Sequence, residues 1–180
     1  MIRKAEMKDT GAVNEIYQRI HDGEETGRVT IGWNRSIYPV LATAQAAVER
    51  GDLFVMEEDG RIVAAAIINQ IQVPEYADCR WEYEAGDDQV CVLHTLVVDP
   101  REGGRGYGTA FVAFYEAYAR EHGWNYLRMD TNERNRNARR MYAKLGYREP
   151  GIVDCVFNGI PGVHLVCLEK FLGENAADEA

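Results

Sequence analysis

The sequence predicts an α/β (α+β) fold, in which helices flank a central sheet that contains antiparallel hairpins. Runs with the two-residue period of strands alternate with runs that have the three- and four-residue spacing of helices. Two turn signals, Asp59-Gly60 and Asn158-Gly159, each join two β-rich runs, as in an antiparallel hairpin. Residues 90–98 are almost continuously apolar, which is typical of a central strand covered on both faces.

The first half of the chain predicts three strands and two helices. Strands are expected at residues 2–5, 53–57 and 61–72. The first helix begins near residue 9 or 10, and Thr43 is expected to cap a second helix that ends at Arg50. Residues 73–88 are polar and aromatic and too long for a simple turn, and long ordered loops are often functional.

The second half predicts a strand, a glycine-rich loop, two helices and three further strands. The expected helices are residues 109–122 and a segment capped by Asn132 or Asn135 that ends at Gly146. Beside residues 90–98, the expected strands are residues 126–129, 147–157 and 163–170. We therefore expect one domain over residues 1–172, followed by an acidic tail, residues 173–180, that is disordered.

The composition excludes several functional classes. A formal net charge of −9 argues against binding to nucleic-acid phosphates, and it suits a cationic substrate, although solubility alone also explains it. Neither a signal peptide nor an apolar run of about 18 residues is seen, so we expect a cytoplasmic protein without a membrane partner. The four cysteines form no CxxC pair, and no metal site is expected.

A glycine-rich loop, residues 103–108, connects the apolar strand to a helix. Successive backbone N–H groups converge there at the positive end of the helix dipole, which is a geometry that binds phosphate. The spacing does not match the Walker loop, because Thr109 stands where lysine is required, and it does not match the dinucleotide fingerprint GxGxxG. A simple glycine turn is the alternative interpretation.

A second segment, residues 135–147, completes a pattern. On a helix Asn135, Ala138 and Tyr142 share one face. Together the two segments resemble the GCN5-related N-acetyltransferase (GNAT) family, whose signature is a strand ending L-x-V, a loop R/Q-x-x-G-x-G/A and a later N-x-x-A-x-x-x-Y-x-x-x-G-F/Y. The resemblance spans essentially the whole chain and implies a GNAT acyl-CoA N-acyltransferase fold with a mostly antiparallel mixed sheet.

The resemblance implies that acetyl-CoA is the cosubstrate. The backbone of Leu96 and Val98 would pair with its pantetheine arm, and the glycine loop would hold its pyrophosphate. Residues assigned to the coenzyme by this resemblance are Leu96, Val98, Gly103, Gly104, Arg105, Gly106, Tyr107, Gly108, Thr109 and Asn135. Gly103 departs from the Arg or Gln usual in the family, and Arg101 or Arg105 is expected to supply the missing charge.

The resemblance places a general acid for the departing thiolate at Tyr142. A glutamate that serves as base in several relatives is replaced here by Val92. His94 lies two residues further along the same strand and thus on the same face, with an ordinary pKa of about 6.5 that suits proton acceptance. A core histidine is the alternative for His94, and Glu82, Glu84 or Asp130 acting through water are the alternative bases.

The acceptor is expected to be a primary amine of a small molecule, an amino acid or a peptide, attacked directly in a ternary complex. Aromatic and acidic side chains of two loop regions and one strand are expected to bind it. The predicted substrate-binding residues are Trp33, Tyr38, Glu82, Tyr83 and Asp130. A non-catalytic acyl-CoA sensor is the alternative function, and a homodimer is an expected assembly because family members are often dimers.

Overall fold

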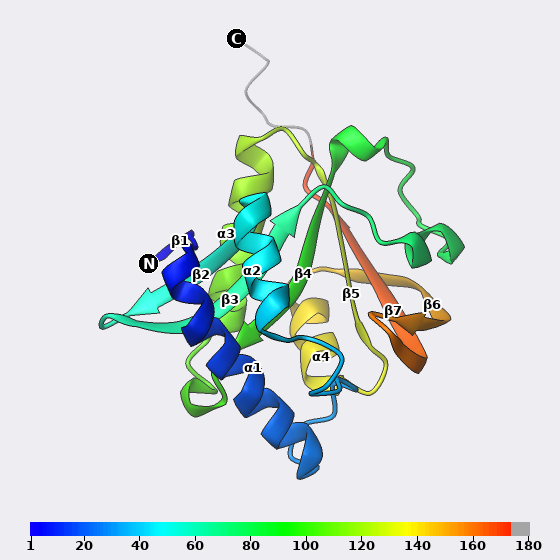
Figure 1. Cartoon of the computed structure of the whole chain (residues 1–180). Coiled ribbons are helices and arrows are strands. Elements are labelled where there is room, and N and C mark those ends of the chain that lie inside the picture. The colour runs from blue at the N-terminus through cyan, green and yellow to red at the C-terminus, as the bar shows by residue number, and fades with distance from the viewer. Residues whose placement is uncertain (174–180) are drawn as a thin grey trace.

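The computed structural model describes residues 1–173 and contains a seven-stranded mixed sheet in the order β1-β2-β3-β4-β5-β7-β6 (Figure 1). The strands are β1 (Ile2–Lys4), β2 (Leu53–Glu58), β3 (Arg61–Asn69), β4 (Val90–Val98), β5 (Tyr126–Asn132), β6 (Arg148–Phe157) and β7 (Ile160–Phe171). Of the pairs between these strands, β4–β5 is parallel and the rest are antiparallel. The predicted fold class is therefore confirmed.

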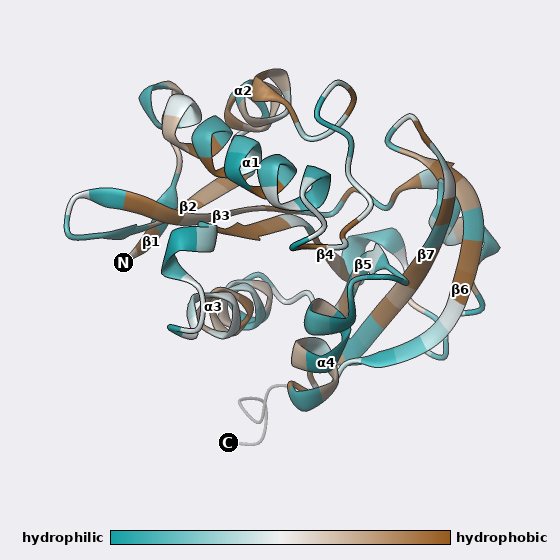
Figure 2. Ribbon diagram, turned by 90° about the horizontal axis from the view of Figure 1, so that it is seen from below, coloured by the Kyte–Doolittle hydropathy of each residue, from teal (hydrophilic) through white to brown (hydrophobic). Residues whose placement is uncertain are grey.

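Within residues 1–173, four α-helices flank the sheet. They are α1 (Thr10–Glu25), α2 (Leu41–Arg50), α3 (Tyr107–Glu121) and α4 (Arg136–Lys144). Seen along the sheet, α1 and α2 lie on one face while α3 and α4 lie on the other (Figure 2). Among the described residues, no helix is long and apolar enough to cross a membrane. Apart from Gly173, the predicted tail lies outside the described residues.

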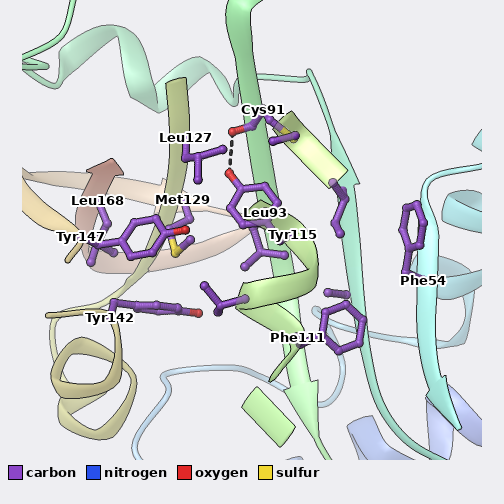
Figure 3. Close-up of a cluster of buried hydrophobic side chains, with 14 of the residues drawn as sticks. Phe54, Cys91, Leu93, Phe111, Tyr115, Leu127, Met129, Tyr142, Tyr147 and Leu168 are labelled. Carbon is purple, nitrogen blue, oxygen red and sulfur yellow. Dashed lines mark hydrogen bonds between the residues drawn. The ribbon is translucent and has the colours of Figure 1, made fainter. Parts of the chain in front are cut away.

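Apolar side chains fill three clusters around this sheet. The first lies between the sheet and α3 and α4, and it contains Phe111, Tyr115 and Leu127 (Figure 3). The second joins α1 and α2 to β2 and β3. The third lies at the β6–β7 end and includes Tyr76 from the loop between β3 and β4. Burial on both faces explains why the sequence of β4 is almost continuously apolar.

Strands β4 and β5 are paired along only part of their length. Their pairing runs from Val90 opposite Tyr126 to Leu93 opposite Met129. Both strands continue beyond these points, β4 to Val98 and β5 to Asn132. Beyond Leu93, the edge of β4 that faces β5 therefore has backbone groups without a strand partner.

A bulge in β4 lies where the two strands separate. The register between β3 and β4 shifts by one residue around Thr95, whose φ of 50° is strained for a β-branched side chain. Leu93 and Leu96 both pack on the α3 side although they are three positions apart. Because side chains alternate along a regular strand, only the extra residue makes this possible.

Most predicted element boundaries agree with the structure to within a few residues. Helix α3 begins at Tyr107, two residues earlier than expected, and β5 extends three residues further, to Asn132. Thr43 does not cap α2 as predicted. It lies inside the first turn, where its Oγ1 accepts a hydrogen bond from Val40 N at 3.0 Å, and the N-cap is Val40, three residues earlier.

Two buried charged residues of the sheet, Arg128 and Glu169, anchor the long loop between β3 and β4. Arg128 on β5 lies opposite Glu169 on β7, and its guanidinium stacks on the Trp81 ring, 4.2 Å from the centroid. Arg128 also donates to the Tyr83 carbonyl at 3.0 Å, while Glu169 accepts from the Glu82 backbone N–H at 2.6 Å. Sheet residues thus satisfy the polar groups of a loop that has little regular structure of its own.

We predict that Glu169→Ala destabilises the protein by about 3 kcal/mol, because it leaves the Glu82 and Tyr83 N–H groups without their acceptor and removes the negative charge opposite the buried Arg128. Glu149→Ala is the matched control. It removes an ion pair to Arg139 whose two side chains are both about 30% exposed, and we expect a loss below about 1 kcal/mol. Urea denaturation of both variants would measure the difference, and equal losses would contradict the anchoring role.

Candidate functional site

A cavity of about 130 Å³ opens where β4 and β5 separate. Its walls come from these two strands, from α4, from the loop between α1 and α2, and from the β6–β7 hairpin. The lining residues predicted from the sequence are Trp33, Tyr38, His94, Leu96, Asp130, Asn135 and Tyr142. The structure thus brings together seven predicted residues from four separate parts of the chain.

Asp130 is the one carboxylate among the described residues that line the cavity. Desolvation raises the pKa of this carboxyl group to about 6, and a hydrogen bond from the Tyr76 hydroxyl to Oδ2, at 2.6 Å, partly opposes the rise. Asp130 is therefore mostly ionised at pH 7 and gains a proton in mildly acidic solution. It can attract a cation and accept a proton.

His94 lines the same cavity from β4. Its Nε2 lies 2.9 Å from Oδ1 of Asn69, which also accepts from Ile71 N at 2.9 Å, so Nε2 is the donor in the first contact. Desolvation lowers the pKa of His94 to about 4. The ring is therefore neutral at pH 7, with Nδ1 as its remaining acceptor.

Tyr142 projects from α4 into the apolar cluster beside Met129 and reaches the cavity wall (Figure 3). Burial raises the pKa of its phenol well above the ordinary value of 10, and the charge of Asp130 adds to the rise. The hydroxyl therefore keeps its proton at any physiological pH. It can donate a hydrogen bond to an atom that becomes negative inside the cavity.

The loop between α1 and α2 covers the β4 bulge. The Tyr38 hydroxyl is hydrogen-bonded to Thr95 Oγ1, and burial raises the pKa of Tyr38 to about 12. Trp33 packs edge-on against Tyr38, with ring centroids 6.1 Å apart. The hydrogen bond between Tyr38 and Thr95 thus joins the loop to the strained residue of the central strand. No local sequence pattern predicts this connection.

The glycine loop forms a cradle at the N-terminus of α3. Gly104 and Gly106 have φ near 80°, and a Cβ at either position would point into open space. The first N–H groups of a helix lack intrahelical partners, so those beyond Gly106 can receive an anion. Leu96 and Val98 lie on the unpaired edge of β4 that leads to this loop. These features fit a pantetheine arm that ends in a pyrophosphate.

Other predicted coenzyme residues have additional or different contacts. Gly103 has an ordinary φ of −60°, so its backbone does not require glycine. A Cβ on Gly108 would approach Met141 Sδ to 3.1 Å, so this glycine also permits close packing of α3 on α4. Asn135 accepts from Ala138 N at 3.2 Å and thereby caps α4.

The two arginines expected to compensate for Gly103 are already paired. Arg101 contacts the buried Asp99 at 2.8 Å, and Arg105 contacts the buried Glu102 at 3.1 Å. Both guanidinium groups are about 60% exposed, so each can still turn one edge toward a bound anion.

The structure does not bring Glu82 and Tyr83 to the cavity. Tyr83 packs against Tyr126 and Phe171, at the opposite end of β5, with ring centroids 6.3 and 5.7 Å away. The Glu82 carboxylate pairs with Arg148 at 2.9 Å. The anchoring of this loop by Arg128 and Glu169 holds both residues away from the cavity.

Sequence reasoning missed the hairpin wall of the cavity. The hairpin contributes five lining residues, Phe157, Asn158, Ile160, Val163 and Leu165. Other lining residues that were not predicted are Val73, Thr95, Thr131 and Asn132. The Asn158-Gly159 signal located the hairpin, but only the sheet order shows that β7 lies next to β5 and so faces the cavity.

Solved acetyltransferases share this architecture. A GNAT acetyltransferase from Streptococcus agalactiae superposes with a TM-score of 0.79 at 21% identity and covers 97% of this chain and 96% of its own. An N-acetyltransferase from Staphylococcus aureus gives 0.72 at 18% identity, with 96% and 98% covered. yncA from Salmonella typhimurium, solved with its cofactor acetyl-CoA, gives 0.67 at 22% identity, with 100% and 98% covered.

Sequence comparison identifies the family. An uncharacterised N-acetyltransferase from Methanocaldococcus jannaschii is 32% identical over 76 residues, which are 42% of this chain and 34% of that relative. The model of the Acetyltransferase (GNAT) family matches residues 13–147, more than half of the chain. The family, the enzyme class and the acetyl-CoA cosubstrate expected from the sequence are thereby confirmed. The chain belongs to the GNAT family of acetyltransferases, enzymes that take an acetyl group from acetyl-CoA.

Proposed function

We propose that this enzyme transfers the acetyl group of acetyl-CoA directly to a primary amine that binds in the cavity between β4 and β5. The observation that carries the proposal is the position of Asp130 and Tyr142 on the wall of one cavity, from different elements. A proton acceptor for the amine and a hydrogen-bond donor for the sulfur thus face the same small volume.

The reaction requires two proton movements. The amine nitrogen forms a bond to the acetyl carbon, and the carbon–sulfur bond breaks with its electron pair on sulfur. The proton lost by the amine passes to an acceptor on the β5 side. The thiolate accepts a hydrogen bond from the Tyr142 hydroxyl and takes up one proton from solvent, which balances the proton lost by the amine.

Asp130 is a better proton acceptor than His94. An alkylammonium ion has a pKa of about 10.4, so its proton must be removed before attack. With pKa values of about 6 and about 4, the two groups differ in basicity by roughly 3 kcal/mol in favour of Asp130. Asp130 also carries the charge that attracts an ammonium ion, whereas His94 is neutral. His94 then serves to orient the amine or a water through Nδ1.

Direct transfer is favoured over an acyl-enzyme. No cysteine is among the described residues that line the cavity, and residues 174–180 contain none. Burial raises the pKa of the Cys91 thiol to about 12, which opposes formation of a nucleophilic thiolate. Release of free CoA with a panel of amines tests the function, and tight binding of acetyl-CoA without turnover of any amine would favour the sensor instead.

The finer assignments of partner and location rest on the sequence. A cytoplasmic location and a homodimer remain predictions. Size-exclusion chromatography with light scattering would measure the assembly.

We predict that Tyr142→Phe lowers kcat by about ten- to a thousandfold, because the leaving sulfur loses its hydrogen-bond donor. The affinity for acetyl-CoA should change little, since the coenzyme is held by the glycine cradle. Steady-state kinetics and calorimetry would measure the two quantities. Tyr147→Phe is a control, because that tyrosine is buried next to Tyr142 but does not line the cavity. An unchanged kcat in Tyr142→Phe would refute the role.

We predict that kcat/KM of the wild-type enzyme has an inflection near pH 6 and rises with pH, because Asp130 must lose its proton before it can accept one. In Asp130→Asn this inflection should vanish and activity at pH 8 should fall about a hundredfold. His94→Gln should keep the inflection. If activity is level above pH 5 and Asp130→Asn retains it, His94 or another group is the base.

A further inference from the structure

We propose that the acceptor is a small apolar amine with one positive charge and no carboxylate, rather than a free amino acid or a peptide N-terminus. This inference rests on the function proposed above and narrows its substrate class. It is derived from the charges, hydrogen bonds and apolar surfaces that line the cavity.

Among the described residues, the cavity has a charged partner for an ammonium ion and no cationic side chain for a carboxylate. Among the described residues, neither lysine nor arginine lines it, and residues 174–180 contain neither. Asp130 contributes a negative charge, and desolvation already raises its pKa. A second carboxylate, brought in by an amino acid, would lie in the same poorly solvated volume without a counter-ion. Burying such a charge costs several kcal/mol.

Two arginines close to cavity residues in the structure or in the sequence are held in other contacts. Arg50 influences the pKa of His94 and Tyr38, but its guanidinium pairs with Asp52 at 2.9 Å. Arg134 follows the lining strand β5 and lies 3.7 Å from Glu24. Releasing either arginine for a substrate would break a contact that the protein already makes.

Several hydrogen-bond acceptors of the cavity are already engaged. Asn132 Oδ1 accepts from Arg134 N at 3.0 Å, and Asn135 Oδ1 accepts from Ala138 N at 3.2 Å. The Tyr38 hydroxyl is bonded to Thr95. Since these side-chain atoms serve the protein's own structure, the amide N–H of a peptide's second residue would find fewer acceptors among these side chains than in water.

The remaining surface is apolar and suits a hydrocarbon. Phe157, Ile160, Val163 and Leu165 line the cavity from the hairpin, and Val73 adds to them from the loop after β3. With a volume of about 130 Å³, shared between the acetyl thioester and the amine, the cavity admits a short alkyl chain or one ring. Burial of that group would supply the affinity, and Asp130 would orient the amine.

Four acceptors with the same side chain test the proposal: isobutylamine, valinamide, valine and valyl-glycinamide. CoA release would be followed with the wild-type enzyme, and kcat/KM expressed per neutral amine. We expect isobutylamine to exceed valine by at least about a hundredfold and to exceed the dipeptide amide as well. Valinamide has nearly the size of valine but no carboxylate, so it separates the effect of charge from that of size. A kcat/KM for valinamide above that for valine would support the inference that valine is excluded because its carboxylate has no counter-ion.

The outcomes distinguish this inference from the function on which it rests. Equal or better use of valine, or preference for the dipeptide amide, would overturn the acceptor class and leave amine acetylation standing. If acetyl-CoA binds by calorimetry but none of the four is acetylated, nor any of a broader amine panel, both proposals fail.

A charge added to the wall provides a second test. In Ile160→Lys, a cation on the hairpin should raise kcat/KM for valine at least tenfold relative to isobutylamine, whereas the control Ile160→Gln should not. If the lysine variant folds, as circular dichroism would show, and its ratio does not change, the missing cation is not what excludes amino acids. If it does not fold, the four wild-type acceptors decide the question.

Discussion

The separation of β4 from β5 after Leu93 and Met129 determines where every other part of the site can lie. Two neighbouring strands normally satisfy each other's backbone groups, and groups left without partners in a protein interior are costly. The enzyme places this unpaired edge beside a glycine loop and a helix N-terminus, where an extended ligand with amide groups and phosphates can bind. The same separation leaves a volume beyond the edge, and that volume is the cavity. In the function proposed here, coenzyme and acceptor therefore meet because of one interruption in a hydrogen-bond ladder.

The β4 bulge refines this arrangement. The extra residue at Thr95 lets His94 face the cavity while Leu96 and Val98 still pack on the α3 side. A strained β-branched residue persists only where its surroundings compensate. The hydrogen bond to Tyr38 is one such compensation, and it comes from a loop nearly sixty positions earlier. The geometry of the central strand thus depends on a contact that lies outside the sheet.

The features that the sequence predicted well are local ones. The bounds of β4, the glycine loop and the Asn135 cap follow from short patterns whose physical cause lies within a few residues. Glu82 and Tyr83 were expected at the cavity but lie away from it. Two sheet residues far along the chain, Arg128 and Glu169, determine the position of their loop. Non-local burial also separates Asp130 from the other candidate bases, since only the assembled fold raises its pKa. The hairpin wall was missed because strand order, not turn chemistry, brings it to β5.

The close packing of α3 on α4 at Gly108 and Met141 lies between the phosphate cradle and Tyr142. Gly108 lies in the first turn of α3, beside the phosphate cradle, and Met141 directly precedes Tyr142 on α4. With so little room between the helices, α3 cannot shift sideways unless the methionine side chain is rearranged. A larger residue at position 108 would therefore press on Met141 and disturb the helix turn that carries Tyr142.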